Sequence, residues 1–214
     1  MTHIDWHNLA GRYTYTEFRE HMGQLLSEGK TTGPDQSPAM IHYTELNEAR
    51  MRRLDKRSRV TEESMKALED IKRPQVWLSL TEAWCGDAAQ IVPVLEQLAE
   101  AHPLIDHYLI LRDEHLDIMD AFLTNGARSI PITVVLDKET NEVLGHWGPR
   151  PSELQNKVME AKAASLAAPT PEERREIREQ AKVEAQKWYA RDKTRSTQNE
   201  ILQTVGAITG SDEA

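Results

Sequence analysis

The stretch Glu82-Ala83-Trp84-Cys85-Gly86-Asp87-Ala88 lies between an apolar run, residues 76–80, and a segment of helical periodicity, residues 86–101. The apolar run is short and follows a proline, which predicts a buried strand. The later segment carries a stripe of aliphatic side chains and contains Pro93, which predicts a kinked helix. The stretch therefore connects a predicted strand to a predicted helix and places Cys85 at the start of that helix.

Cys85 is the only cysteine in the chain. At the start of a helix, free backbone N–H groups and the helix dipole favour a thiolate. With no second cysteine, the chain cannot form an internal disulfide. Any redox chemistry of Cys85 must therefore use the sulfur atom of a partner.

Length and charge narrow the classes of function. The chain has 214 residues and a formal net charge of −9, which argues against nucleic acid or an anionic membrane as the main partner. The first residues have neither the basic flank nor the apolar stretch of a signal peptide, and no window approaches the roughly 18 apolar residues of a membrane span. With one thiol and no export signal, we expect the protein in the reducing cytoplasm.

The middle of the chain alternates strands and helices. Apolar runs and turn signals predict the order strand, helix, strand, helix, strand, strand, helix, over residues 76–80, 86–101, 105–111, 114–123, 132–136, 143–147 and 152–168. Parallel strands joined by helices and closed by an antiparallel hairpin give an α/β fold. We expect a mixed sheet of four to five strands flanked by helices.

Helical extensions are predicted on both sides of this domain. Residues 1–61 form the N-terminal extension, residues 62–163 the α/β domain, and residues 164–214 the C-terminal extension. A loop at residues 29–38 separates two helical segments of the N-terminal part. The basic residues between Arg50 and Arg59 are interpreted as a solvated helix face.

The C-terminal extension begins with a capping box at Thr170-Pro171-Glu172-Glu173. The helix that follows carries a narrow apolar stripe, Ile177, Ala181, Ala185 and Trp188. Trp188 and Tyr189 are predicted to pack on the domain, and a homodimer contact through this helix is the alternative. Beyond Arg195 the tail is mostly polar, and we expect it to be frayed.

Four features in register resemble the thioredoxin superfamily over roughly residues 62–163. Trp84-Cys85-Gly86 is similar to the family's motif before the active-site helix, and Pro93 matches the proline that kinks that helix. Ile130-Pro131 matches the family's Ile-Pro, and Gly148 matches a glycine near the active site. The resemblance implies a thioredoxin-like fold in which Pro131 is cis and lies against the sulfur of Cys85. It implies a binding site formed by Trp84, Gly86, Asp87, Ile130, Pro131 and Gly148.

Departures from the family pattern remove the dithiol chemistry. Ala88 stands where the second cysteine would be, and Ser79 corresponds to the buried acid of many members. Asp87 puts a carboxylate in the first helical turn, so we expect a thiol less acidic than in reductases. The segment Leu46-Asn47-Glu48-Ala49-Arg50-Met51-Arg52-Arg53-Leu54-Asp55-Lys56, together with Trp-Cys-Gly-Asp, resembles a branch of bacterial thioredoxin-like proteins.

Two functions compete. In the first, a monothiol thiol-disulfide oxidoreductase, Cys85 attacks a disulfide or accepts glutathione, and an outside thiol resolves the mixed disulfide. Its partners are protein or small-molecule thiols. In the second, a non-catalytic binding module, the groove at Trp84, Ile130 and Pro131 holds a partner chain, which could add as an extended strand. Of the two functions, the position of Cys85 at the start of a helix favours the redox function.

Two related chemistries fit less well. A one-cysteine glutaredoxin with an iron–sulfur cluster would have Cys-Gly-Phe-Ser, and a one-cysteine peroxidase would have threonine where Glu82 stands. Glu82 is interpreted as a solvated loop charge. The histidines show no spacing that places two on one face, so neither a metal site nor a cofactor is predicted.

Overall fold

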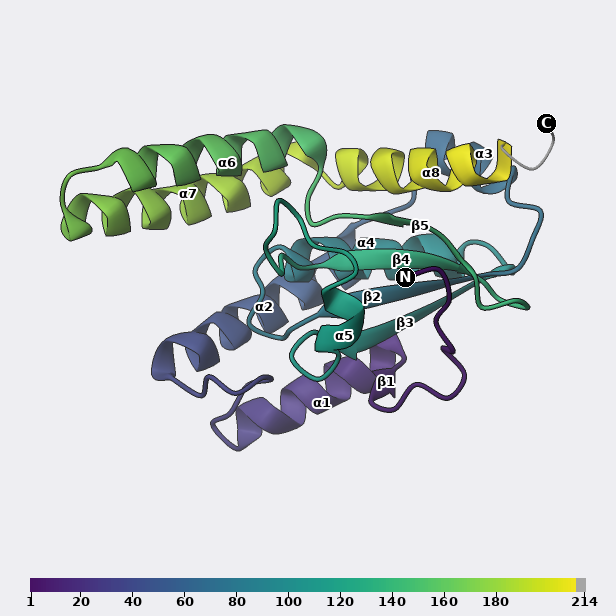
Figure 1. Cartoon of the computed structure of the whole chain (residues 1–214), viewed down its shortest axis with the longest axis horizontal. Helices are drawn as coiled ribbons and strands as arrows, with labels where there is room; N and C mark the ends of the chain where they lie inside the picture. Colours follow the sequence, from purple (N-terminus) through teal and green to yellow (C-terminus); the bar gives the residue numbers. More distant parts are fainter. Residues whose placement is uncertain (211–214) are drawn as a thin grey trace.

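The computed structural model describes residues 1–210, in which a five-stranded mixed sheet is flanked by eight helices (Figure 1). The strands are β1 (Arg12–Tyr13), β2 (Gln75–Thr81), β3 (Ile105–Leu111), β4 (Ile132–Asp137) and β5 (Val143–Trp147). The helices are α1 (Tyr15–Ser27), α2 (Pro38–Arg57), α3 (Glu62–Leu68), α4 (Ala88–Glu100), α5 (Leu116–Met119), α6 (Ser152–Ala167), α7 (Pro171–Asp192) and α8 (Arg195–Gly210). The predicted thioredoxin-like α/β fold with helical extensions is confirmed.

The sheet has the order β1-β3-β2-β4-β5. β2 and β3 are parallel and are joined through α4, whereas β1, β4 and β5 each run antiparallel to their neighbours. A parallel pair needs a crossover, which α4 supplies, and an antiparallel pair can be joined by a short turn, as β4 and β5 are. Cys85 lies in the crossover connection, at the carboxyl end of the central strand β2.

Each face of the sheet carries its own hydrophobic core. Side chains alternate along β2, so Val76, Leu78 and Leu80 point to one core and Trp77 points to the other. The first core is covered by the N-terminal segment and α1. The second is covered by α3, α4 and the C-terminal helices. Because β2 is buried along its whole length, its sequence is mainly apolar, and the hydroxyl of its buried Ser79 is hydrogen-bonded.

Most of the predicted elements lie where the patterns place them. The strands at 105–111 and 143–147 have the expected bounds, and the helix predicted from Ser152 ends one residue early. The helix predicted at 114–123 is shorter, because only Leu116–Met119 is helical. The two-residue strand β1 was not predicted, since it is too short to show a hydrophobic period.

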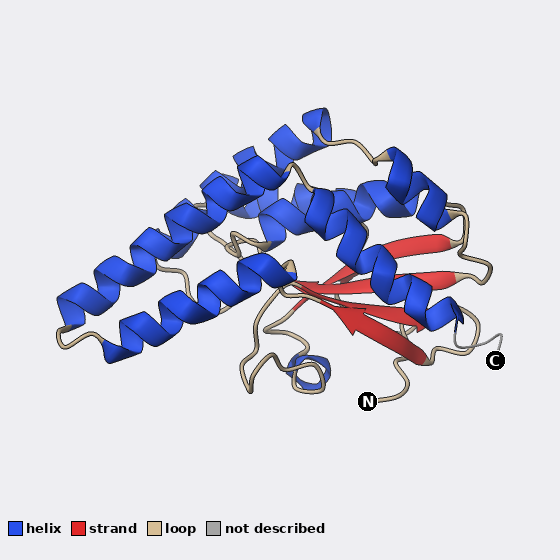
Figure 2. Cartoon of the chain, turned by 90° about the horizontal axis from the view of Figure 1, so that it is seen from above, coloured by secondary structure: helices blue, strands red, loops and turns tan. Residues whose placement is uncertain are grey.

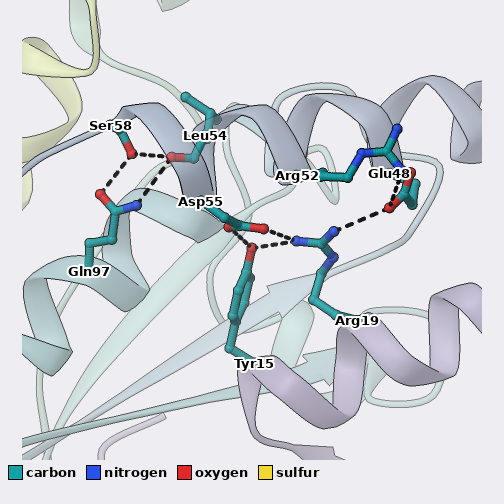
Figure 3. A network of polar contacts seen from close by, with 8 residues as sticks. All are labelled: Tyr15, Arg19, Glu48, Arg52, Leu54, Asp55, Ser58 and Gln97. Carbon is teal, nitrogen blue, oxygen red and sulfur yellow. Dashed lines mark hydrogen bonds and ion pairs between the residues drawn. The ribbon is translucent and has the colours of Figure 1, made fainter.

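Two helices of the N-terminal extension are tied to each other and to the domain by polar contacts (Figure 3). Arg19 of α1 pairs with Asp55 of α2 at 2.5 Å, and the Tyr15 hydroxyl donates to the same carboxylate at 2.6 Å. At the end of α2, the Ser58 hydroxyl lies 2.7 Å from the side-chain oxygen of Gln97 on α4. These contacts hold α2 beside the helix that begins at the Cys85 loop.

The C-terminal extension forms a helical hairpin, α6 and α7, followed by α8 on the sheet (Figure 2). The expectation of a frayed tail beyond Arg195 is wrong for residues 195–210, because Ile201 and Val205 of α8 are fully buried against the second core. The Gln198 side chain also accepts from the Thr61 amide at 3.0 Å. Residues 211–214 lie outside the described part of the chain.

We predict that Ile201→Ala lowers the free energy of unfolding by about 2–5 kcal/mol, the usual cost of truncating a buried aliphatic side chain. Urea unfolding followed by circular dichroism measures the change. Gln203→Ala, on the exposed side of the same helix, is the control and should leave stability nearly unchanged. Equal effects of the two variants would contradict the packing of α8 on the sheet.

Candidate functional site

Cys85 lies in the loop between β2 and α4, and its side chain is buried with 8% of its surface exposed. Its sulfur accepts a hydrogen bond from the Ala88 amide at 3.5 Å, so an N–H group in the first turn of α4 points at the thiol. The thiol in turn donates to the carbonyl oxygen of Ile130 at 3.4 Å. The sulfur therefore joins the start of α4 to the loop before β4.

The pKa of Cys85 is raised to about 12, first by burial and then by the negative charge of Asp87. The amides of Ala88 and Asp87 and the guanidinium of Arg150 act in the opposite direction. The sequence correctly predicted the sign of the helix effect and the weak acidity of this thiol. The burial that outweighs the helix amides was not predicted.

Ile130, Pro131 and Gly148 meet beside this thiol. The Ile130–Pro131 peptide bond is cis, and both residues are buried. Gly148 has φ of +127°, and a Cβ there would lie 2.4 Å from the carbonyl oxygen of Pro131. Only glycine tolerates this backbone conformation and this close approach. The loop after β5 therefore packs directly against Pro131 and Ile132.

Asp87 is held by two side chains that the sequence did not associate with the site. Arg150, in the loop after β5, forms an ion pair with its carboxylate at 2.7 Å, and the Tyr189 hydroxyl of α7 donates to it at 3.0 Å. Burial raises the pKa of Tyr189 well above its usual value, so this hydroxyl stays protonated as a donor. Asp87 is thus an anchor between three segments, beyond its expected role as a first-turn helix residue.

Gly86 is enclosed by residues from α2 and α7. A carbon atom added at its Cα would lie 3.4 Å from the side-chain nitrogen of Gln186 and 3.5 Å from the Arg50 guanidinium. Asn47 is fully buried and donates to the carbonyl oxygen of Ala83 at 2.8 Å, and Arg50 donates to Asn47 at 2.7 Å. Arg50 is half-buried, so its interpretation as part of a solvated face is wrong.

Trp84 is half-buried beside this loop. The Arg112 guanidinium lies 4.8 Å from the centre of its ring, within the range of a cation–π interaction. Arg112 also pairs with Asp113 at 2.8 Å. Of the predicted binding residues, Trp84 therefore offers a flat aromatic face at the surface of the site.

Glu82 is not a solvated loop charge, because only 1% of its surface is exposed. Its carboxylate accepts from the Asp113 amide at 2.9 Å. Burial raises its pKa above the usual value, although hydrogen bonds from Thr32 and Asp113 act in the opposite direction. The wrong interpretation came from treating the loop as exposed, whereas the segment around Thr32 covers it.

Ser79, at the position of the family's buried acid, belongs to a chain of polar side chains inside the domain. Its hydroxyl lies 2.9 Å from both the His107 ring and the Thr133 hydroxyl. The other ring nitrogen of His107 lies 2.7 Å from the Glu96 carboxylate on α4. This chain ties three strands and α4 together.

The predicted site residues therefore converge, and further side chains complete the site. Arg150, Tyr189, Gln186 and Asn47 were missed because they come from segments far away in the sequence. The Asn-x-x-Arg stretch of α2 was the one sequence signal that pointed to Asn47 and Arg50. Within residues 1–210, no three His, Cys, Asp or Glu side chains are grouped so that they could hold a metal ion. None of the helices in that range combines the length and the apolar character that a membrane span needs.

A thioredoxin family model matches residues 33–164, more than half of the chain. Two solved structures are similar in fold, and both alignments cover 91% of this chain. A protein of unknown function from Pseudomonas aeruginosa is 17% identical, with 98% of its chain covered and a TM-score of 0.52. An HIV epitope-scaffold is 18% identical, with 99% of its chain covered and a TM-score of 0.50. No curated protein matches the sequence.

We predict that Glu82→Gln makes the protein more stable than the wild type at pH 8, with a difference that shrinks towards pH 4. A raised native pKa means that the folded protein binds this proton more tightly than the unfolded chain. Wild-type stability is therefore lost as the pH rises above the unfolded value of about 4.3. Glutamine keeps the oxygen acceptor for the Asp113 amide and removes the charge.

Urea unfolding at a series of pH values measures this difference. Glu139→Gln, the same substitution in the exposed turn between β4 and β5, is the control and should follow the wild type. A loss of stability in Glu82→Gln that is equal at all pH values would contradict the burial of a costly charge.

Proposed function

The chain belongs to the thioredoxin family, and from that premise we propose that it is a non-catalytic binding protein in which Cys85 serves as a structural thiol. One observation carries this proposal: the sulfur is buried, and the pKa of Cys85 is raised to about 12. This proposal differs from the redox function that the sequence favoured, because the Cys85 thiol is buried.

Thiol-disulfide exchange requires a thiolate. With a pKa of about 12, only about one molecule in 10⁵ carries the thiolate at pH 7. The S–H group instead donates to the carbonyl oxygen of Ile130. A peptide strand bound in the groove would compete with the thiol for that oxygen. Ala88 at the second motif position and the absence of another cysteine leave no resolving thiol in the chain.

The partner surface that we propose is centred on Trp84 and Arg112. Ile130 and Pro131 are buried, whereas Trp84 is only partly buried, with the Arg112 guanidinium 4.8 Å from the centre of its ring. Tryptophan and arginine are among the residue types most enriched in the hot spots of protein interfaces. A protein segment is therefore the proposed partner, with the reducing cytoplasm of a bacterium as its compartment.

A second candidate function is a monothiol exchange reaction that follows opening of α7. It is favoured by the Ala88 amide, which is aimed at the sulfur as in a thiolate site. α7 reaches the loop through polar contacts, from Gln186 to the Gly86 carbonyl and from Tyr189 to Asp87. In this reaction the thiolate attacks a protein or glutathione disulfide and expels one thiolate, and an outside thiol then reduces the mixed disulfide.

We predict that alkylation of native Cys85 by iodoacetamide rises about tenfold per pH unit from pH 7 to 10 without reaching a plateau. The thiolate fraction grows in this way when the pH stays below a pKa of about 12. Mass spectrometry follows the reaction, and the chain in urea is the control, with a plateau near the usual thiol pKa of about 8.5. A native plateau near pH 7 would establish redox chemistry in place of the structural role.

The second candidate predicts that Tyr189→Phe accelerates alkylation of Cys85 at pH 8, because the variant removes one hydrogen bond that holds α7 on Asp87. Tyr13→Phe, which removes a hydroxyl from β1 instead, is the control. Exchange with oxidised glutathione, measured as a mixed disulfide by mass spectrometry, should rise in parallel. No change in either rate would exclude opening of α7 as the route to the thiol.

A further inference from the structure

α6 and α7 form an antiparallel helical hairpin that extends past the end of the sheet (Figures 1 and 2). The end of α7 is fixed to the domain by the buried side chains of Ala185, Trp188 and Tyr189. Towards the turn at residues 168–170, the two helices pack mainly on each other. Most helical stability in proteins comes from packing of an apolar face, so apolar side chains left open on this hairpin would gain from a partner.

One side of the hairpin is a groove with a volume of about 270 Å³. Val158 and Ala161 of α6 and Ile177, Ala181 and Ala185 of α7 lie along it, with Trp188 at its inner end. The α7 residues are spaced by three or four positions, the period with which one helix faces another. A helix of another chain that lies along the hairpin would therefore meet a row of apolar side chains.

The charges of the hairpin point to a second copy of this chain as that partner. Residues 152–192 contain eight Lys or Arg and eight Asp or Glu, so the hairpin is neutral although the whole chain carries −9. Two copies can meet here without the repulsion that opposes contact elsewhere on the surface. The rim of the groove carries both signs, with Lys157 and Arg191 beside Glu184, which suits a self-complementary contact.

The size of the hairpin also suits a dimer. α7 has 22 residues and is therefore about 33 Å long, and two helices side by side are about 20 Å wide. The face covers on the order of 600 Å² per copy, close to the roughly 800 Å² per partner of a typical specific interface. We propose that two copies of the chain associate through this groove into a four-helix bundle around a twofold axis. This inference is independent of the proposed function of Cys85.

The test is analytical ultracentrifugation of the full chain between 1 and 100 µM. We expect the wild type to sediment at about twice the 24.4 kDa mass of one chain at the upper concentrations. Ala181→Glu places a charge inside the groove and should weaken the dimer more than tenfold. Val183→Glu, two residues away on the exposed side of the same helix, should remain dimeric like the wild type.

Circular dichroism checks that each variant is folded. If Ala181→Glu loses helix content, Ile177→Lys near the hairpin turn replaces it, with the same expected loss of the dimer. A wild type that stays monomeric at 100 µM overturns the proposal. Equal weakening by Val183→Glu and by the groove variant overturns the assignment of this face.

Discussion

The ion pair between Asp87 and Arg150 is the interaction on which the state of the site depends. It joins the start of α4 to the loop after β5, and the Tyr189 hydroxyl adds α7 to the same carboxylate. Three segments thus close on one acid two residues from Cys85, whose side chain is buried with 8% of its surface exposed. Burial raises the pKa of this thiol to about 12, and the negative charge of Asp87 acts in the same direction.

The fold was predictable because its signals are local. The central strand is an apolar run interrupted only by Ser79 within residues 76–80. The two residues that flank Cys85, Trp84 and Gly86, belong to a motif of fixed spacing. The hairpin turn that ends at Asn141 and the Ile130-Pro131 step are likewise recognised from a few adjacent residues. Such features need no knowledge of distant segments, so the sheet and its crossover helix were predicted with nearly correct bounds.

The parts that sequence reasoning missed depend on contacts between distant segments. Glu82 looked like a loop charge, but the loop at Thr32 buries it, and no local pattern indicates that cover. The polar tail was expected to fray, yet Ile201 and Val205 fit the second core once α8 reaches the sheet. Arg150 and Tyr189 likewise acquire their role only when the chain has folded around Asp87.

The first residues of the chain have a consequence for handling the protein. The Ile4 amide donates to the Asn141 carbonyl at 3.0 Å and the Val143 amide to the Thr2 carbonyl at 2.9 Å, so this segment covers part of the outer edge of the β4–β5 hairpin. Open strand edges recruit other chains into aggregates. Removing the residues up to Ile4 would expose backbone groups of this edge, whereas a fusion tag at the opposite terminus would leave these hydrogen bonds in place.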